Sequence, residues 1–208
     1  MSGGYFQFQA PQLRILPIRG IEFATPAKQR AALLTKSTQL VEKAVAKNDA
    51  SVVLRFAEEQ LAAKPERADV VHDLLAFLAE EMTRLNGQKR AIAKQFLTDL
   101  KDFHGIHVRF MNPKTKMYEF WKLDAADVFA HFRANKVRLK ENDEEKIRER
   151  FSQSKSALVP LDSQIAFADW VIDQIVYRLY GLTPEEINIV EGGSNAKRET
   201  AKKGARNG

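Results

Sequence analysis

The sequence predicts a mainly α fold, a multi-helix bundle with a short N-terminal strand and a small irregular or β insertion. Three observations lead to this prediction. The chain has 208 residues, 44% of them hydrophobic, which suffices for one domain or two small ones with a buried core. Apolar residues recur every three or four positions through most of the chain, which is the period of an amphipathic helix. Alternation typical of strands is confined to the N-terminus and to residues 104–122.

Residues 1–24 differ in pattern from the rest of the chain. Residues 3–8 alternate weakly and predict a short strand. Residues 13–18 are expected to be extended around Pro17, because the position before a proline disfavours the α conformation. A strand this short finds no long partner in the remaining sequence. Such a segment is unusual as the start of an independent domain.

Residues 25–103 predict a series of helices. Thr25–Pro26 opens the first, with the threonine as N-cap and the proline in the first turn. A second helix is expected over about 50–63. A third begins near Asp69, and Asn86–Gly87 either ends it before a fourth helix or is a tolerated interruption.

Residues 104–122 are the least helical stretch in the middle of the chain. Ile106, Val108 and Phe110 alternate with polar residues, a pattern that fits a short strand. The Asn-Pro-Lys-Thr-Lys sequence at 112–116 is typical of a turn.

Further helices are expected after this insertion. One spans about 124–135, and a charged helix begins at Asp143. A separate helix over about 161–180 is apolar around much of its circumference and should be central in the fold. Gly181 ends it. The Thr-Pro-Glu-Glu sequence at 183–186 then predicts a short helix that begins with a capping box.

The formal net charge of +6 is concentrated at the two ends of the chain. Residues 1–30 carry +3, residues 31–191 carry −1 and residues 192–208 carry +4. The last segment is small, polar and basic, so we expect a disordered tail that binds polyanions weakly.

Several classes of protein are excluded by what the sequence lacks. Without cysteine there is no disulfide framework, thiolate zinc site or cysteine nucleophile. No apolar run approaches the roughly 18 residues of a membrane-spanning helix. Residues 1–7 do not have the charge and apolar pattern of a signal peptide. These features favour a soluble cytoplasmic protein.

No catalytic, cofactor-binding or metal site is predicted. The four histidines do not combine with acidic residues into a metal-ligand pattern. The sequence has no phosphate-binding glycine loop and no Gly-x-Ser-x-Gly elbow. Residues 144–146 form the Glu-x-Lys triplet found in some nucleases, but they lie in a charged helix where such triplets are common.

One constellation suits nucleic acid. Residues 101–122 carry a net charge of +3 and interleave basic, amide and aromatic side chains. Lys and Arg on a turn contact phosphates, and Arg or Asn reads base edges. The alternative is a solvated loop over an aromatic mini-core, and packing is favoured over base stacking as the role of the aromatics. The candidate DNA-binding residues of this segment are Arg109, Asn112, Lys114, Thr115 and Lys116.

The C-terminal part of the chain carries a family resemblance. Residues 172–187 read IDQIVYRLYGLTPEEI, and residues 189–192 read IVEG. This order resembles the closing segment of large bacterial adenine-N6 DNA methyltransferases, including the fused nuclease–methyltransferases of type IIG restriction–modification systems. Residues 114–136 and 69–75 are similar to weaker blocks of the same family.

The resemblance implies a division of the chain. Residues 1–24 resemble the last strand of a target recognition domain, which makes Arg14 and Arg19 further DNA-binding candidates. The helical spacer would be 25–103, the C-terminal helical region 104–191 and the basic tail 192–208.

The resemblance also implies a DNA-recognition and support part without its own chemistry. Its partners would be double-stranded DNA and the catalytic part of the enzyme, in cis or in trans, and S-adenosylmethionine would bind to that catalytic part. Two other hypotheses stay open. The chain could be an all-α protein-interaction module that docks onto a separate methyltransferase subunit, or an independent enzyme, which would then bind or cleave S-adenosylmethionine.

Overall fold

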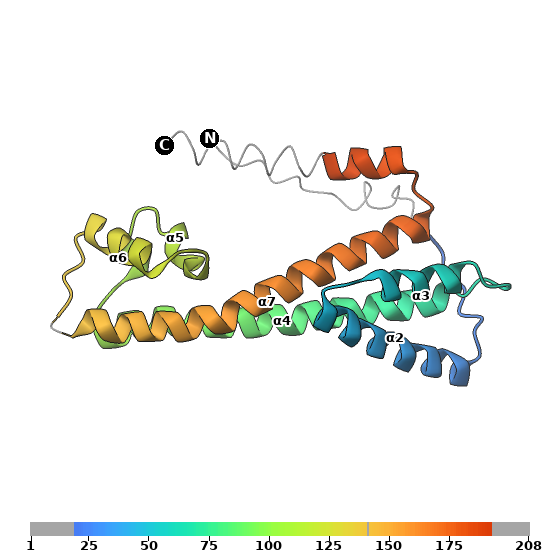
Figure 1. Ribbon diagram of the computed structural model, residues 1–208, viewed down its shortest axis with the longest axis horizontal. Helices are drawn as coiled ribbons and strands as arrows, with labels where there is room; N and C mark the ends of the chain where they lie inside the picture. The colour runs from blue at the N-terminus through green and yellow to red at the C-terminus, as the bar shows by residue number, and fades with distance from the viewer. Residues whose placement is uncertain (1–18, 141, 193–208) are drawn as a thin grey trace.

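Two long helices run side by side along an elongated molecule (Figure 1). The computed structural model describes residues 19–140 and 142–192, where α4 (Ala68–His104) and α7 (Asp143–Tyr180) form this pair. Within these residues there is no strand, and the predicted mainly α bundle is confirmed. The strand expected at 3–8 and residues 193–208 of the expected tail lie outside the described residues, whereas Gly192, where the tail was expected to begin, is helical.

The proximal half of the molecule consists of residues 19–88 and 161–192. Here α2 (Ala27–Lys47) and α3 (Ser51–Leu61) pack against the first half of α4 and the second half of α7 (Figure 1). Its core is mostly aliphatic, and its large fully buried members are Val53, Val70, Leu74, Leu78 and Ile175.

The distal half consists of residues 89–140 and 142–160. Between α4 and α7 the chain forms the short elements η1 (Val108–Phe110), α5 (Thr115–Tyr118), η2 (Phe120–Lys122) and α6 (Ala125–Ala134). They pack on the second half of α4 and the first half of α7 around a core rich in aromatic rings, which comprises Phe96, Phe120, Trp121, Phe129, Phe132 and Phe151.

The predicted helix boundaries near the middle of α4 and α7 are not present. Asn86–Gly87 is a tolerated interruption, because α4 continues through it. The predicted separation of a helix at Asp143 from one at 161–180 is wrong, since α7 is continuous through Pro160. Pro160 is exposed, as is the residue four positions before it, so water can satisfy the carbonyl that loses its helical hydrogen bond. An ion pair between Lys89 and Asp162 joins the two helices near this level.

Thr25 does not cap a helix, which corrects another expectation. α2 begins at Ala27, and Thr25 reaches Asp69 in the first turn of α4 instead. Its backbone N–H donates to Asp69 Oδ2 at 2.8 Å, and its hydroxyl donates to Oδ1 at 2.7 Å. Burial raises the pKa of Asp69, but these hydrogen bonds outweigh it and lower the pKa overall. The segment before α2 is thus tied to α4.

The alternating stretch at 106–110 is not a strand. Val108–Phe110 is a 3-10 turn, in which the Phe110 N–H donates to the His107 carbonyl at 3.1 Å. No neighbouring strand offers backbone partners among the described residues, and the turn still buries Ile106 and Val108. The predicted boundary at 103/104 falls at the end of α4.

The ends of the long helices follow the sequence signals. Gly105 and Gly181 have φ values of +67° and +64° and end α4 and α7 in the left-handed conformation that glycine adopts easily. The capping box is confirmed. The Thr183 N–H donates to Glu186 Oε2 at 2.8 Å, the Glu186 N–H donates to Thr183 Oγ1 at 3.3 Å, and residues 184–192 are helical.

Candidate nucleic-acid interface

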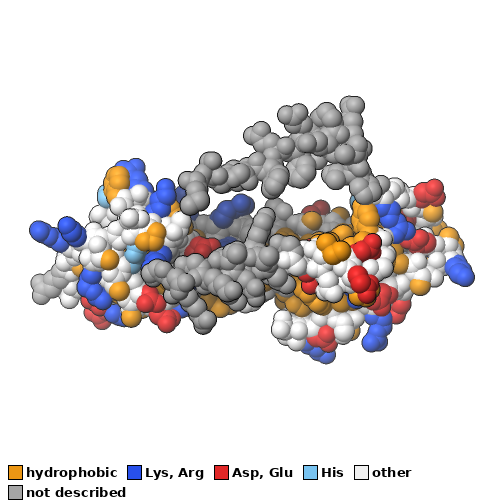
Figure 2. Space-filling view, turned by 90° about the horizontal axis from the view of Figure 1, so that it is seen from above, with side chains coloured by type: hydrophobic (Ala, Val, Ile, Leu, Met, Phe, Trp, Pro, Cys, Tyr) orange, Lys and Arg blue, Asp and Glu red, His pale blue; other side chains and the backbone are white. Residues whose placement is uncertain are grey.

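The two halves of the molecule carry opposite net charges. Residues 89–160 contain 16 Lys and Arg against 10 Asp and Glu, a net charge of +6. Residues 19–88 and 161–192 together contain 11 Lys and Arg against 16 Asp and Glu, a net charge of −5. Figure 2 shows Lys and Arg side chains over the end of the molecule formed by the distal half. The charge of −1 over residues 31–191 therefore hides a strong separation in space.

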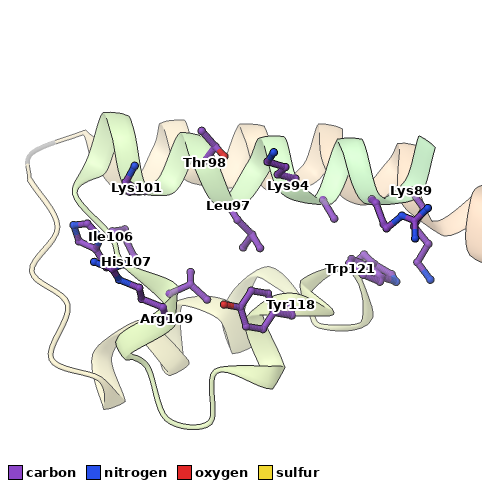
Figure 3. Close-up of a pocket in the computed structure, with 13 residues that line it drawn as sticks. Lys89, Lys94, Leu97, Thr98, Lys101, Ile106, His107, Arg109, Tyr118 and Trp121 are labelled. Atoms are coloured by element: carbon purple, nitrogen blue, oxygen red, sulfur yellow. The ribbon is translucent and has the colours of Figure 1, made fainter. Parts of the chain in front are cut away.

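A groove of about 660 Å³ lies in the distal half, between α4 and the segment 106–121 (Figure 3). α4 forms one wall, and η1, Tyr118 and Trp121 form the other. None of the described residues that line the groove is acidic. Its cations are Lys89, Arg90, Lys94, Lys101 and Arg109.

Two of these five cations have carboxylate partners. Lys89 pairs with Asp162 and lies 5.0 Å from the centroid of the Trp121 ring, while Lys101 Nζ is 3.1 Å from Asp102 Oδ1. Burial raises the pKa of Asp162, but hydrogen bonds from Lys89 and from Trp121 Nε1, the latter at 2.8 Å, lower it overall. This carboxylate therefore stays charged and holds Trp121 in place.

The other three cations have no ion-pair partner among the described residues. Arg90 and Lys94 are exposed on α4. The guanidinium carbon of Arg109 lies 4.6 Å from the centroid of the Phe110 ring, a cation–π arrangement that leaves its N–H donors available. Three uncompensated charges around one groove favour an anionic ligand.

The floor of the groove is apolar. Ala93 and Leu97 contribute from α4, and Val108 and Trp121 from the opposite wall. The aromatic residues at 118–121 have two different environments. Phe120 and Trp121 are buried and pack in the distal core, as predicted, whereas Tyr118 is 45% exposed at the groove.

The structure separates the predicted DNA-binding residues into two places. Arg109 lines the groove. Asn112, Lys114, Thr115 and Lys116 are exposed without lining it. The first two lie on the turn before α5 and the last two lie in α5, so the turn predicted at 112–116 ends at Lys114. Asn135 pins this turn, because its Oδ1 accepts the Asn112 N–H at 2.7 Å.

Arg19 lies at the other end of the molecule, in the proximal half. Its backbone N–H donates to the Tyr180 hydroxyl at 3.3 Å, and its guanidinium binds the Leu179 carbonyl and Glu66. Arg19 therefore closes the end of α7 against neighbouring segments and does not join the groove. Arg14 lies outside the described residues.

The groove cations on α4 were not among the predicted site residues. Arg90, Lys94 and Lys101 stand at positions i, i+4 and i+11 of one helix, so they share a face. This spacing is visible in the sequence. The spacing identifies a groove only once the fold places η1 opposite this face of α4.

The histidines have structural partners rather than a shared site. His104 Nδ1 lies 2.8 Å from Asp143 Oδ1, which links the end of α4 to the start of α7. Burial and then the charge of Lys116 lower the pKa of His131, although a hydrogen bond with the Pro113 carbonyl opposes this. No three metal-binding side chains cluster within residues 19–140 and 142–192.

Fold and groove define the chain as an elongated α-helical protein with a cation-lined groove at one end. It belongs to the family described as "Domain of unknown function (DUF8810)", whose model matches residues 69–176, more than half of the chain. The match runs from the first turn of α4 into the last turns of α7 and includes the whole groove. Neither a curated protein nor a solved structure matches the chain. Among the described helices, none has the length and apolarity to cross a membrane.

Proposed function

We propose that this chain binds double-stranded DNA through its distal half and supports target recognition for an adenine-N6 DNA methyltransferase. The observation that carries the proposal is the carboxylate-free groove with Arg90, Lys94 and Arg109 uncompensated, set in a half of net charge +6. Lys114, exposed on the adjoining turn, and Lys116, exposed on α5, extend the same basic surface. Such a surface neutralises phosphates and releases counterions.

The link to methylation rests on the resemblance of residues 172–187 to the closing segment of those enzymes. In this proposal the catalytic part, in cis or in trans, binds S-adenosylmethionine and carries out methyl transfer in the cytoplasm. The described chain contributes affinity for DNA and orientation on it, which are the tasks of phosphate contacts.

The test is the salt dependence of duplex binding by the full chain. With three to five phosphate contacts, the logarithm of the association constant should fall with the logarithm of salt concentration with a slope of about −3 to −4.5. The double variant Lys94→Glu/Arg109→Glu should weaken binding and reduce the magnitude of this slope by about 2. Fluorescence anisotropy between about 50 and 200 mM salt measures both.

The control variant is Lys43→Glu, an exposed lysine on α2 in the proximal half. Lys43→Glu changes the net charge by the same amount as either of the two groove substitutions alone. All three proteins keep the basic residues 192–208, so any binding by that segment is the same in each. Equal affinity of the double variant and the wild type, or a flat salt dependence, would overturn the proposal.

A second candidate function is docking onto a separate methyltransferase subunit. Three large apolar side chains of the proximal half, Trp170, Tyr180 and Ile189, are exposed, and each offers apolar surface that a partner subunit could cover. Copurification with that subunit, lost in Trp170→Glu and kept in Lys94→Glu/Arg109→Glu, would support this function over DNA binding.

A further inference from the structure

The groove contains an aromatic side chain that the distal core does not use. Tyr118 is 45% exposed, whereas its neighbours Met117 and Phe120 are fully buried. Phe120 packs against three other rings, Phe96, Trp121 and Phe151. Within the described residues the Tyr118 side chain makes no ring pair and no hydrogen bond, so almost half of its surface is available to a ligand.

Tyr118 faces the apolar wall of α4 across the groove. Figure 3 shows Leu97 pointing from α4 toward the Tyr118 side chain, with Arg109 on one side and Trp121 on the other. A flat group placed between Leu97 and Tyr118 would cover apolar surface on both of its faces. Thr98 and His107 also line the groove and offer polar atoms at its edge.

The size of the groove restricts its occupant. A volume of about 660 Å³ is that of a small-molecule site, for which about 300–1,000 Å³ is usual. Duplex DNA keeps its bases stacked inside, so its phosphates can reach the cations at the rim but its base faces cannot reach the floor. An unpaired nucleotide presents a planar base and an adjacent phosphate together.

We propose that the groove binds an unpaired nucleotide of a DNA strand, with its base stacked on Tyr118 against Leu97 and its phosphates held by Lys94 and Arg109. Charge complementarity favours this anionic occupant over a neutral or cationic one, and the apolar floor favours a ligand with a planar base over inorganic phosphate. The inference deepens the proposed DNA binding and rests on it. In this arrangement the duplex lies along the basic surface, while a base that is unpaired at a frayed or opened site enters the groove.

The experiment compares a fluorescein-labelled DNA single strand with the blunt duplex of the same sequence, each titrated with the full chain. In Tyr118→Ala, affinity for the single strand should fall about 5- to 150-fold, the range for one lost base–aromatic stack. Affinity for the duplex should stay unchanged, because the rim cations are intact. Tyr118→Phe keeps the ring and should bind the single strand like the wild type.

Phe103→Ala is the matched control. Phe103 is an aromatic side chain of the distal half, 73% exposed on α4, and does not line the groove. Its replacement should leave both affinities unchanged. A strand that carries 2-aminopurine adds a direct readout, since its fluorescence is quenched when it stacks, and this quenching should disappear in Tyr118→Ala.

The outcomes separate this inference from the proposed function. Duplex binding by the wild type together with equal single-strand affinities of the wild type and Tyr118→Ala overturns the inference and leaves duplex binding standing. Single-strand binding that depends on Tyr118, without duplex binding, supports the inference and overturns the duplex proposal. If the wild type binds neither probe, both are wrong. Thermal unfolding of each variant checks that the substitution leaves the fold intact.

Discussion

The proximal and distal halves share the same two helices but build different cores. In the proximal half, α2 and α3 add regular helices with aliphatic side chains, and Phe56 is the one fully buried aromatic residue of that core among the described residues. The distal core contains six aromatic residues: Phe96 and Phe151 come from the two long helices, Phe120 and Trp121 from η2, and Phe129 and Phe132 from α6. Because η2 and α6 are short, their inward residues must each bury a large apolar surface, and aromatic side chains supply about 150–250 Å² each.

The two halves differ in net charge as well as in the composition of their cores. The distal half carries +6 and the proximal half −5. Both long helices have their helix-breaking residue near the junction of the halves, Gly87 in α4 and Pro160 in α7, close to the Lys89–Asp162 ion pair. One helical pair therefore supports an acidic end with an aliphatic core and a basic end with an aromatic core and a cation-lined groove.

Removing one buried side chain from each core should give the largest effects. Phe96→Ala deletes a ring whose centroid lies 4.1 Å from that of Phe120, and should lower the free energy of unfolding by about 3–5 kcal/mol. Leu74→Ala in the proximal core should cost about 2–5 kcal/mol. Denaturant unfolding followed by circular dichroism measures both.

The two tryptophans report on the halves separately, Trp121 in the distal half and Trp170 in the proximal half. Trp170→Phe leaves only Trp121 as a fluorescent reporter, and Trp121→Phe leaves only Trp170. The denaturant unfolding curves of these two variants should coincide, because α4 and α7 run through both cores. Separate transitions in Phe96→Ala would mean that the halves unfold independently.

Mild acid should lower the free energy of unfolding through His131, which lies in the distal half. Since burial and the Lys116 charge lower the pKa of His131 in the folded state, the unfolded state binds the proton more readily. This stabilising contribution is complete above the unfolded value of about 6.5 and is lost as pH falls through the lower folded value. Unfolding free energies at a series of pH values between about 7.5 and 4.5 measure it.

The variant His131→Gln should remove this part of the pH dependence. His72→Gln, which replaces an exposed histidine of the proximal half, should keep it. Asp69 belongs to a lower pH range, because its lowered pKa makes its contribution disappear only as pH falls below about 4. A pH profile of His131→Gln identical to that of the wild type would contradict the assignment.

The smallest expected effect is at the junction of the halves. Gly87→Ala places a Cβ with no atom within 4 Å and should raise the free energy of unfolding by about 0.5–1 kcal/mol. If the junction is rigid during binding, affinity for duplex DNA stays the same. A changed affinity would show that α4 bends between the halves when DNA binds.

The sequence predicted helices more reliably than their ends. The apolar periodicity located the α2, α3, α4, α6 and α7 regions, and the capping box at Thr183 and Glu186 was placed correctly. The sequence wrongly predicted a break before residue 161. α7 continues through Pro160 because packing on both sides of the proline offsets the cost of the missing hydrogen bond. The sequence also wrongly predicted that Thr25 caps the first helix. The Thr25 hydroxyl could bind the nearby helix start or Asp69, 44 positions away, and only the fold shows that it binds Asp69.

For the candidate site, the sequence identified the basic turn and Arg109 but not the groove. The strand expected at 106–110 would have paired with a neighbour. The 3-10 turn instead places Val108 and Arg109 across from Leu97 and Lys94. Arg19 was grouped with the DNA-binding residues on charge and resemblance, and the fold uses it to close the end of α7.

By itself, the sequence determined the class of fold, the positions of most helices and the presence of a basic segment, because these depend on local periodicity and composition. The antiparallel pairing of α4 with α7 determined how the charges are distributed and where the groove lies. It divided a nearly neutral body into halves of +6 and −5, and it set the cations of α4 beside Tyr118 and Arg109. Neither result can be read from local pattern, since each depends on which distant residues the long helices place at the same level.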